Sequence, residues 1–178
     1  MNKLFFTQEH YMIRDMVRKF AETEIAPVAR ELDATGTFPR ELVKKMGKLG
    51  IMGINVPEKY GGAGLDMVSF ATAIIELARV DASVAITMAA HTSLGTLPVL
   101  LFGTEKQRQR YLPGLASGNT LGAFGLTEPQ AGSDAGATKT KAVRSGNDYI
   151  VNGGKIFITN AGEAQVLSFT SQVIEGDK

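Results

Sequence analysis

The spacing of apolar residues changes near residue 120, and this change predicts two parts in the chain. Before that point apolar residues recur about every 3.6 positions, the period of an amphipathic helix. The first such helix is indicated by Met12, Ile13, Met16, Val17 and Phe20. After residue 121 the period shortens towards two, which is typical of strands. The pattern predicts an α+β protein, with an all-α part over residues 1–120 and a β part over residues 121–178.

Cap residues and helix breakers predict where the helices begin and end. Four residues have the side chain and the position of an N-cap: Thr7, Asp66, Asp81 and Thr104. Pro27 is expected to kink or divide the first helix, because proline lacks the N–H group that a helix interior needs. Pro39 suits the first turn of a second helix, and Gly50 suits its end.

The helix expected after residue 81 is apolar on nearly every side. Its run of apolar residues over 84–94 therefore indicates a helix in the protein interior. Gly95 and Pro98 predict a break after this run. A polar helix follows, and Pro113 is expected to end it.

Five short runs predict strands in the second part. They cover residues 121–126, 138–143, 149–152, 155–159 and 166–173, with Gly and Asn in the turns between them. Short strands joined by short turns are expected to pair with their neighbours. We therefore expect the start of an antiparallel β-domain.

Composition narrows the class of protein. A net charge of +1 argues against nucleic acid or an anionic membrane as a partner. With no cysteine and two histidines, neither a disulfide framework nor a metal site is predicted. No apolar run is expected to reach the ~20 residues of a membrane span. The first six residues are too soon followed by polar ones to be a signal peptide, so we expect a cytoplasmic protein.

Residues 121–134, LGAFGLTEPQAGSD, hold the strongest candidate for binding chemistry. The hydroxyls of Thr127 and Ser133 can hold a carbonyl or phosphate oxygen, and Gly132 lets a ligand approach the backbone closely. Pro129 restricts Glu128 to extended geometry. Loops of this composition are most often ordinary turns, so the residues by themselves leave both interpretations open.

Four motifs in this order resemble the acyl-CoA dehydrogenase family. They are PEKYGG at 57–62, FGTEKQ at 102–107, TEPQAGSD at 127–134 and KIFITN at 155–160. Within the family, the stretch LGAFGLTEP is most similar to the short-chain, or butyryl, branch. The resemblance implies a helical N-terminal domain and an incomplete antiparallel β-domain of acyl-CoA dehydrogenase type. The C-terminal four-helix domain of the family is absent from this sequence.

The resemblance also implies a reaction. In the family, FAD takes a hydride from the β-carbon of an acyl-CoA thioester while a Glu removes the α-proton, and the product is a trans-2-enoyl-CoA. That Glu belongs to the C-terminal domain, so no residue of this chain is expected to be catalytic. Glu128 is interpreted as structural, capping or orienting its loop. His91 is expected to be a hydrogen-bonded core residue.

The resemblance assigns contacts residue by residue. The expected FAD contacts are Phe124, Leu126, Thr127, Ser133, Phe157, Ile158 and Thr159. The expected acyl-CoA contacts are Ile86, Met88, Ala90 and, again, Ser133. Without the resemblance, Phe157 and Ile158 fit an ordinary buried strand face, and the residues of 86–90 fit an ordinary helix core.

Three functions stay open at this point. The first is the N-terminal portion of an FAD-dependent short-chain acyl-CoA dehydrogenase. It would pass electrons to electron-transferring flavoprotein, and it would form a homo-oligomer or associate with a C-terminal half. The second is a related flavin enzyme of the same fold, of the monooxygenase or nitroalkane oxidase type. The third is a non-catalytic interaction module, because unpaired strand edges and uncovered apolar faces favour association.

Overall fold

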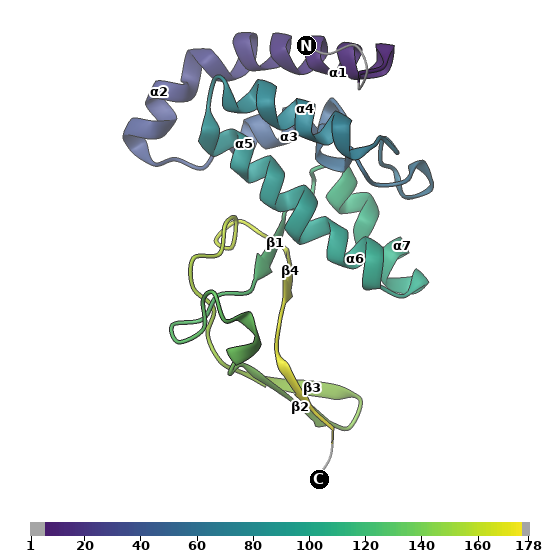
Figure 1. Cartoon of the computed structure of the whole chain (residues 1–178), viewed down its shortest axis with the longest axis vertical. Helices are drawn as coiled ribbons and strands as arrows, with labels where there is room; N and C mark the ends of the chain where they lie inside the picture. Colours follow the sequence, from purple (N-terminus) through teal and green to yellow (C-terminus); the bar gives the residue numbers. More distant parts are fainter. Residues whose placement is uncertain (1–5, 176–178) are drawn as a thin grey trace.

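The computed structural model describes residues 6–175. The prediction that the first six residues are not a signal peptide therefore falls mostly outside the described residues, as do the predictions for residues 176–178. A helical part lies above a smaller β part in Figure 1. Within the described residues the α-helices are α1 Gln8–Phe20, α2 Ala26–Thr35, α3 Arg40–Lys48, α4 Met67–Ala78, α5 Ala82–Ala89, α6 Leu97–Phe102 and α7 Glu105–Ala116. The strands are β1 Gly122–Gly125, β2 Lys141–Ser145, β3 Asp148–Asn152, β4 Val166–Phe169 and β5 Gln172–Ile174. The predicted α+β class is confirmed.

The predicted helix starts are also confirmed. The side chains that accept a hydrogen bond from a backbone N–H two or three residues later are those of Thr7, Asp66, Asp81 and Thr104. Each such cap satisfies a donor that the helix itself leaves unpaired, and is typically worth about 1 kcal/mol. Gly50 follows α3 with a φ of 79°, the left-handed conformation expected where a helix stops.

Two π-helical turns carry helices past prolines that were expected to break them. The turn Ala21–Ile25 joins α1 to α2, and the turn Ala90–Thr96 joins α5 to α6. Pro27 and Pro98 each lie in the first turn of the α-helix that follows. In a regular α-helix a proline clashes with the carbonyl one turn earlier and cannot donate a hydrogen bond to it. A wider π turn just before the proline moves that carbonyl away and so avoids both problems. The division of the first helix expected at Pro27 takes the form of a π-helical turn just before the proline, whereas the break expected after Gly95 is wrong, because the helix continues through it.

The resulting helix Ala82–Phe102 also corrects the expectation that no apolar run approaches the length of a membrane span. It has 21 residues and a mean hydropathy of 1.5, so by length and composition it is long enough to cross a membrane. Half of its apolar window is buried in the described structure, as in the core helix of a globular domain. The expectation that Pro113 ends the polar helix is also wrong: α7 contains Pro113 in its interior and continues to Ala116.

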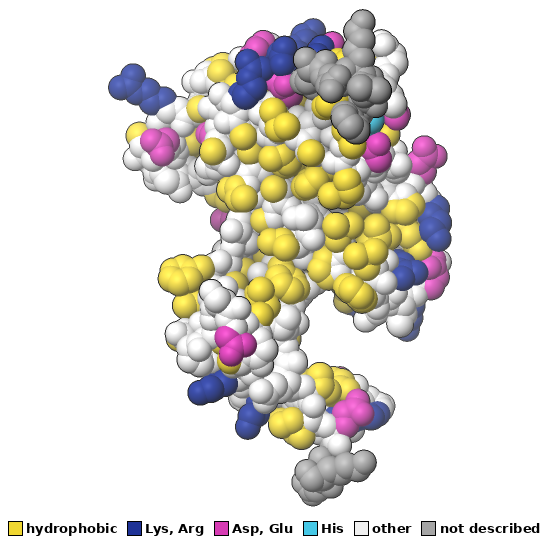
Figure 2. All heavy atoms as spheres, in the orientation of Figure 1, with side chains coloured by type: hydrophobic (Ala, Val, Ile, Leu, Met, Phe, Trp, Pro, Cys, Tyr) yellow, Lys and Arg dark blue, Asp and Glu magenta, His cyan; other side chains and the backbone are white. Residues whose placement is uncertain are grey.

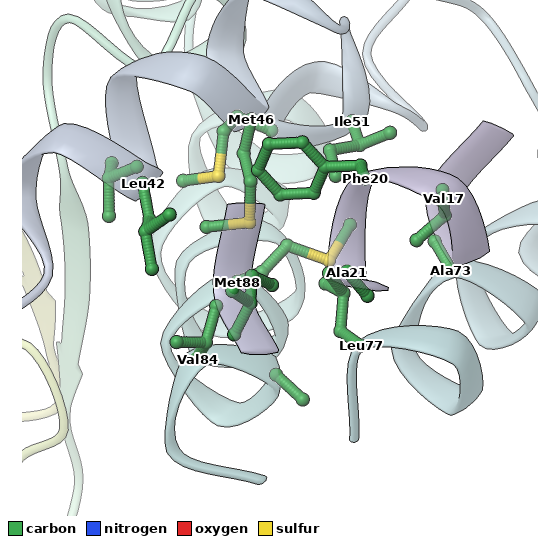
Figure 3. Close-up of a cluster of buried hydrophobic side chains, with 14 of the residues drawn as sticks. Val17, Phe20, Ala21, Leu42, Met46, Ile51, Ala73, Leu77, Val84 and Met88 are labelled. Atoms are coloured by element: carbon green, nitrogen blue, oxygen red, sulfur yellow. The ribbon is translucent and has the colours of Figure 1, made fainter. Parts of the chain in front are cut away.

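The main hydrophobic core joins the first five α-helices. Figure 3 shows side chains of α1, α3, α4 and α5 meeting in one cluster, with Phe20, Met46 and Met88 close together. Met46 and Met88 are fully buried, as is Leu77 of α4. Burial of one such side chain contributes roughly 1.5–3 kcal/mol, so this cluster dominates the stability of the helical part.

Strand pairing in the β part is mixed. The strands β2 and β3 form the expected antiparallel hairpin, whereas β1 pairs with β4 and β2 pairs with β5 in parallel. The predicted strand over 166–173 is two strands, β4 and β5, which belong to different sheets. The predicted strand over 155–159 is wrong: this segment is irregular, and Phe157 has a φ of 57°, which lies outside the β region.

The helical part and the β part meet where the helix Ala82–Phe102 crosses β1. At this crossing two glycines face each other: a Cβ added to Gly95 would lie 2.4 Å from the carbonyl carbon of Gly122. One turn earlier, the fully buried His91 spans the same joint. Its Nδ1 accepts a hydrogen bond from the Gly122 N–H at 2.9 Å, and its Nε2 donates to the Leu115 carbonyl at 3.1 Å.

These two bonds fix the state of the His91 ring. A backbone N–H can only donate and a carbonyl can only accept, so the ring is the neutral tautomer with its proton on Nε2. Burial lowers the pKa of His91 from 6.5 to about 4. His91 is therefore the hydrogen-bonded core residue that the sequence predicts.

Replacement of Gly95 by alanine should destabilise the protein. In an ordinary helix this change stabilises by about 1 kcal/mol, but here the new methyl group meets the backbone of β1, and overpacking of this kind costs roughly 1–3 kcal/mol. Urea unfolding of Gly95→Ala measures the effect. The matched control is Gly132→Ala, where an added Cβ has no neighbour within 4 Å. An unfolding midpoint for Gly95→Ala at or above that of the wild type would contradict the proposed contact.

The buried His91 should make stability fall as the pH drops below about 6.5. The unfolded chain binds the proton near pH 6.5 and the native chain only near pH 4, so protonation favours the unfolded state between these values. The free energy of unfolding should decrease by about 2 kcal/mol from pH 7 to pH 5 through this group. In His91→Gln, whose amide can make both hydrogen bonds without titrating, the decrease should be smaller by that amount. Equal slopes for the two proteins would show that His91 is not buried and neutral.

Candidate functional site

A cavity of about 220 Å³ opens where three segments meet. The first is the π-helical turn Ala90–Thr96, the second is the carboxyl end of β1, and the third is the irregular segment over residues 157–159. The side chains that line it are Ala90, Leu94, Phe124, Leu126, Thr127, Phe157, Ile158 and Thr159. We call this space the β1 cavity.

Six of the seven predicted FAD contacts line the β1 cavity, and they come from two motifs about 30 residues apart in the sequence. The exception is Ser133. Its side chain is exposed in the loop after Glu128, and it is not among the residues that line the cavity. The structure therefore brings the two motifs together but leaves Ser133 outside. The contacts of these residues with a cofactor stay predictions.

The predicted acyl-CoA contacts divide into three environments. Ala90 lines the β1 cavity, and Ile86, one turn earlier on the helix, is 54% exposed on the outer surface. Met88 is fully buried in the helical core, because residues two apart on a helix lie on nearly opposite sides. Its predicted substrate contact is thus corrected to a core position. Leu94 was not predicted, although its position four residues after Ala90 places it on the same helix face.

The segment that carries Phe157 is held at both ends by hydrogen bonds to other elements. At one end the Ile156 N–H donates to the Thr127 carbonyl at 2.9 Å. At the other, Asn160 Nδ2 donates to the Thr87 carbonyl at 3.0 Å. Between them Phe157 has a left-handed backbone and a ring that is 90% exposed. An aromatic side chain held in an unfavourable conformation at the edge of a cavity is a common feature of binding sites.

Glu128 is buried beside the β1 cavity but does not line it. It accepts four hydrogen bonds, from Lys155 Nζ at 2.7 Å, Gln130 Nε2 at 2.6 Å and the backbone N–H groups of Lys139 and Thr140 at 2.7 and 3.0 Å. The bond from the Lys155 ammonium, followed by those from the backbone N–H groups of Lys139 and Thr140, lowers the pKa of Glu128 to about 2. A carboxylate so fully occupied is a poor general base, which agrees with its predicted structural role.

The lining determines what the β1 cavity can do chemically. Its lining residues are apolar except for Thr127 and Thr159, and no acidic, basic or histidine side chain lines it. Such walls can shield a flat ligand from water and hydrogen-bond one of its edges. They cannot transfer a proton. Among the residues that the structure describes, no cluster of side chains suits a metal ion.

Known proteins resemble this chain along nearly its whole length. The sequence model described as acyl-CoA dehydrogenase, N-terminal domain, matches residues 7–119, and the one described as acyl-CoA dehydrogenase, middle domain, matches residues 123–177. An acyl-CoA dehydrogenase of Bacillus subtilis (strain 168) is 55% identical over 90% of this chain and 42% of its own length. A short-chain specific acyl-CoA dehydrogenase of Clostridium acetobutylicum is 51% identical over 89% of this chain and 42% of its own length.

Solved structures agree with these matches. The acyl-CoA dehydrogenase of Bacillus anthracis, complexed with FAD, superposes with a TM-score of 0.91 at 40% identity, over 97% of this chain and 31% of that one. This chain therefore spans about two fifths of the length of the curated relatives it matches. Because the two domain models match in order and the fold agrees, the chain belongs to the acyl-CoA dehydrogenase family.

Proposed function

We propose that this chain forms one side of the flavin and substrate site of an FAD-dependent short-chain acyl-CoA dehydrogenase, which converts an acyl-CoA thioester to the trans-2-enoyl-CoA. The observation that carries the proposal is the convergence of residues 124–127 and 157–159 on one cavity, beside Ala90 and Leu94. The name of the Clostridium acetobutylicum relative supports the short-chain branch, and the FAD complex of the Bacillus anthracis relative supports the cofactor.

The residues present fit a flavin ring. A flavin is flat, with an apolar edge and an edge of carbonyl and N–H groups, and the β1 cavity has apolar walls with two hydroxyls. Its volume of about 220 Å³ is below the roughly 300–1,000 Å³ of a complete ligand pocket. This chain would thus supply one wall, and the remainder of the site would come from outside it. When bound, FAD supplies the acceptor for the hydride.

Each wall of the cavity has its own role in the proposal. Thr127 and Thr159 hydrogen-bond the polar edge of the flavin and so stabilise the charge that the reduced form carries. Phe157 covers one edge of the ring and excludes water. Ala90 and Leu94 form the boundary towards the acyl chain, where the small side chain of Ala90 leaves room for a short substrate.

The proton-transfer group is expected outside this chain. No carboxylate or imidazole lines the β1 cavity, and Glu128 is held by four hydrogen bonds. We therefore propose that the base belongs to a portion of the protein corresponding to the rest of the relatives' length. Electron-transferring flavoprotein as the acceptor, a homo-oligomer and a cytoplasmic location are further parts of the proposal that rest on the family resemblance.

Exposed apolar surface favours association with another chain. A non-catalytic interaction module is therefore the second candidate function. Figure 2 shows hydrophobic side chains gathered over the helices α4 to α6. The exposed fractions are 58% for Ile75, 60% for Leu101 and 84% for Phe102. Contiguous surface of this kind usually has a partner. A C-terminal half of the enzyme would cover it under the first candidate, and an unrelated chain under the second. No observation here favours a monooxygenase or nitroalkane oxidase.

The experiment that tests the proposal is the visible absorption spectrum of the purified chain with FAD and then with butyryl-CoA. We expect weak flavin binding and no bleaching by butyryl-CoA, because the cavity is one wall of a site and has no base. Bleaching would mean that a base lies within these residues. Complete absence of binding, also after addition of a relative's C-terminal portion, would favour the interaction module.

The two hydroxyls of the β1 cavity give a second test. In any form of the protein that binds FAD, the double variant Thr127→Val, Thr159→Val should bind it about tenfold or more weakly, as expected for the loss of two hydrogen bonds of roughly 1 kcal/mol each. Flavin fluorescence titration measures the change. Thr35→Val is the matched control, since Thr35 is exposed on α2 and its hydroxyl bonds only local groups. Equal affinities for the double variant and the wild type would remove the predicted role of both hydroxyls.

A further inference from the structure

We propose that Glu128 and Lys155 are a positioning pair, which locks the two flavin-facing segments of the β1 cavity together and keeps that wall electrically neutral. The inference rests on the proposed function for the identity of the ligand. The locking itself follows from contacts within the chain and can be tested without FAD.

Lys155 ties its segment to the strand opposite. Its ammonium donates to Glu128 Oε1 at 2.7 Å, to the Leu126 carbonyl at 3.0 Å and to Thr170 Oγ1 at 3.1 Å. All three N–H donors are used, and the side chain is only 10% exposed. The stem of Lys155 crosses β1 at Gly125, where an added Cβ would lie 3.1 Å from its Cγ. A side chain larger than hydrogen at Gly125 would disturb this path.

Glu128 is fixed from the other side. Its backbone forms a tight pair with Ala131, in which each N–H donates to the other residue's carbonyl at 2.9 and 3.1 Å. The backbone N–H groups of Lys139 and Thr140 then hold its carboxylate. The loop that leaves β1 and the chain that enters β2 thus converge on one carboxylate. These backbone groups fix the position of the carboxylate independently of Lys155.

The pair replaces the hydrogen-bond ladder that a strand would supply. Residues 155–159 are irregular and lack ladder bonds, so a single backbone bond, from Ile156 to Thr127, joins them to the chain just after β1. Lys155 adds a bond to the Leu126 carbonyl, on the residue just before Thr127. Together with that backbone bond, the ion pair therefore sets how far residues 157–159 lie from residues 126 and 127.

Loss of one partner would leave an uncompensated charge beside the β1 cavity. In Glu128→Gln the Lys155 ammonium keeps its positive charge with neutral acceptors only, whereas in Lys155→Met the carboxylate keeps three donors and its negative charge. A reduced flavin carries negative charge. The unpaired cation should stabilise it and the unpaired anion should destabilise it, because unit charges interact strongly in a site with little water.

The first test uses the free chain and amide hydrogen exchange. We expect the Ile156 N–H to exchange about tenfold or more faster in Glu128→Gln and in Lys155→Met than in the wild type. The matched control is Glu76→Gln, which removes another buried carboxylate, bonded to Arg18 and Arg79 in the helical part. It should leave Ile156 unchanged. Exchange at Ile156 equal in all four proteins would overturn the inference.

A gentler variant covers the case in which the charge variants do not fold. Thr170→Val removes one of the three acceptors of Lys155 and leaves the ion pair in place. We expect about fivefold faster exchange at Ile156, the equivalent of one hydrogen bond. Unchanged exchange in Thr170→Val, in a chain whose circular dichroism matches the wild type, would count against the lock.

The second test uses the FAD-loaded protein and the midpoint potential of its flavin. The potential should rise in Glu128→Gln, fall in Lys155→Met and return towards the wild-type value in the double variant. A purely structural role would shift both single variants in the same direction, so shifts of the same sign, or none, would overturn the electrostatic part. If the wild type never binds FAD, the proposed function fails while the exchange result still decides whether the pair locks the segments.

Discussion

The close contact between Gly95 and Gly122 is the constraint on which the rest of the structure depends. Only two residues without side chains let a helix and a strand approach so closely, and His91 then bonds to the N–H of one of them. The β1 cavity opens at this joint, because the residues just before Gly95 form one wall and the residues just after Gly122 form another. Changes at the joint would therefore move both walls at once.

Polar groups around the β1 cavity are divided into those that face a ligand and those that hold the walls. Thr127 and Thr159 line the cavity, whereas the Glu128–Lys155 ion pair lies beside it and does not line it. A ligand would meet an apolar surface with fixed hydrogen-bonding points, and would not meet a titrating group. This division suits a surface that binds and orients a ligand without exchanging a proton with it.

Local signals in the sequence were sufficient for part of the fold and of the site. Thr7, Asp66 and Asp81 cap helices because a cap needs only a short polar side chain and the next few N–H groups. Most of the cavity lining was named by the resemblance of the motifs around Thr127 and Phe157 to the acyl-CoA dehydrogenase family, and not by a local rule. The π-helical turns were missed because proline and glycine rules assume a regular α-helix. The irregular segment at 155–159 was missed because its apolar alternation is that of a strand, whereas its conformation depends on Lys155 and Asn160, which bond to distant residues.

The number of residues in the π-helical turn Ala90–Thr96 determines which side chains of the following helix face β1. An α-helix turns by about 100° per residue, so one residue more or fewer within this turn would rotate everything that follows by that angle. With the present length, Leu94 faces the β1 cavity and Gly95 faces Gly122. With one residue fewer, a regular α-helix would be possible, but a neighbouring side chain would occupy the crossing. Insertions and deletions should therefore be excluded from these seven residues.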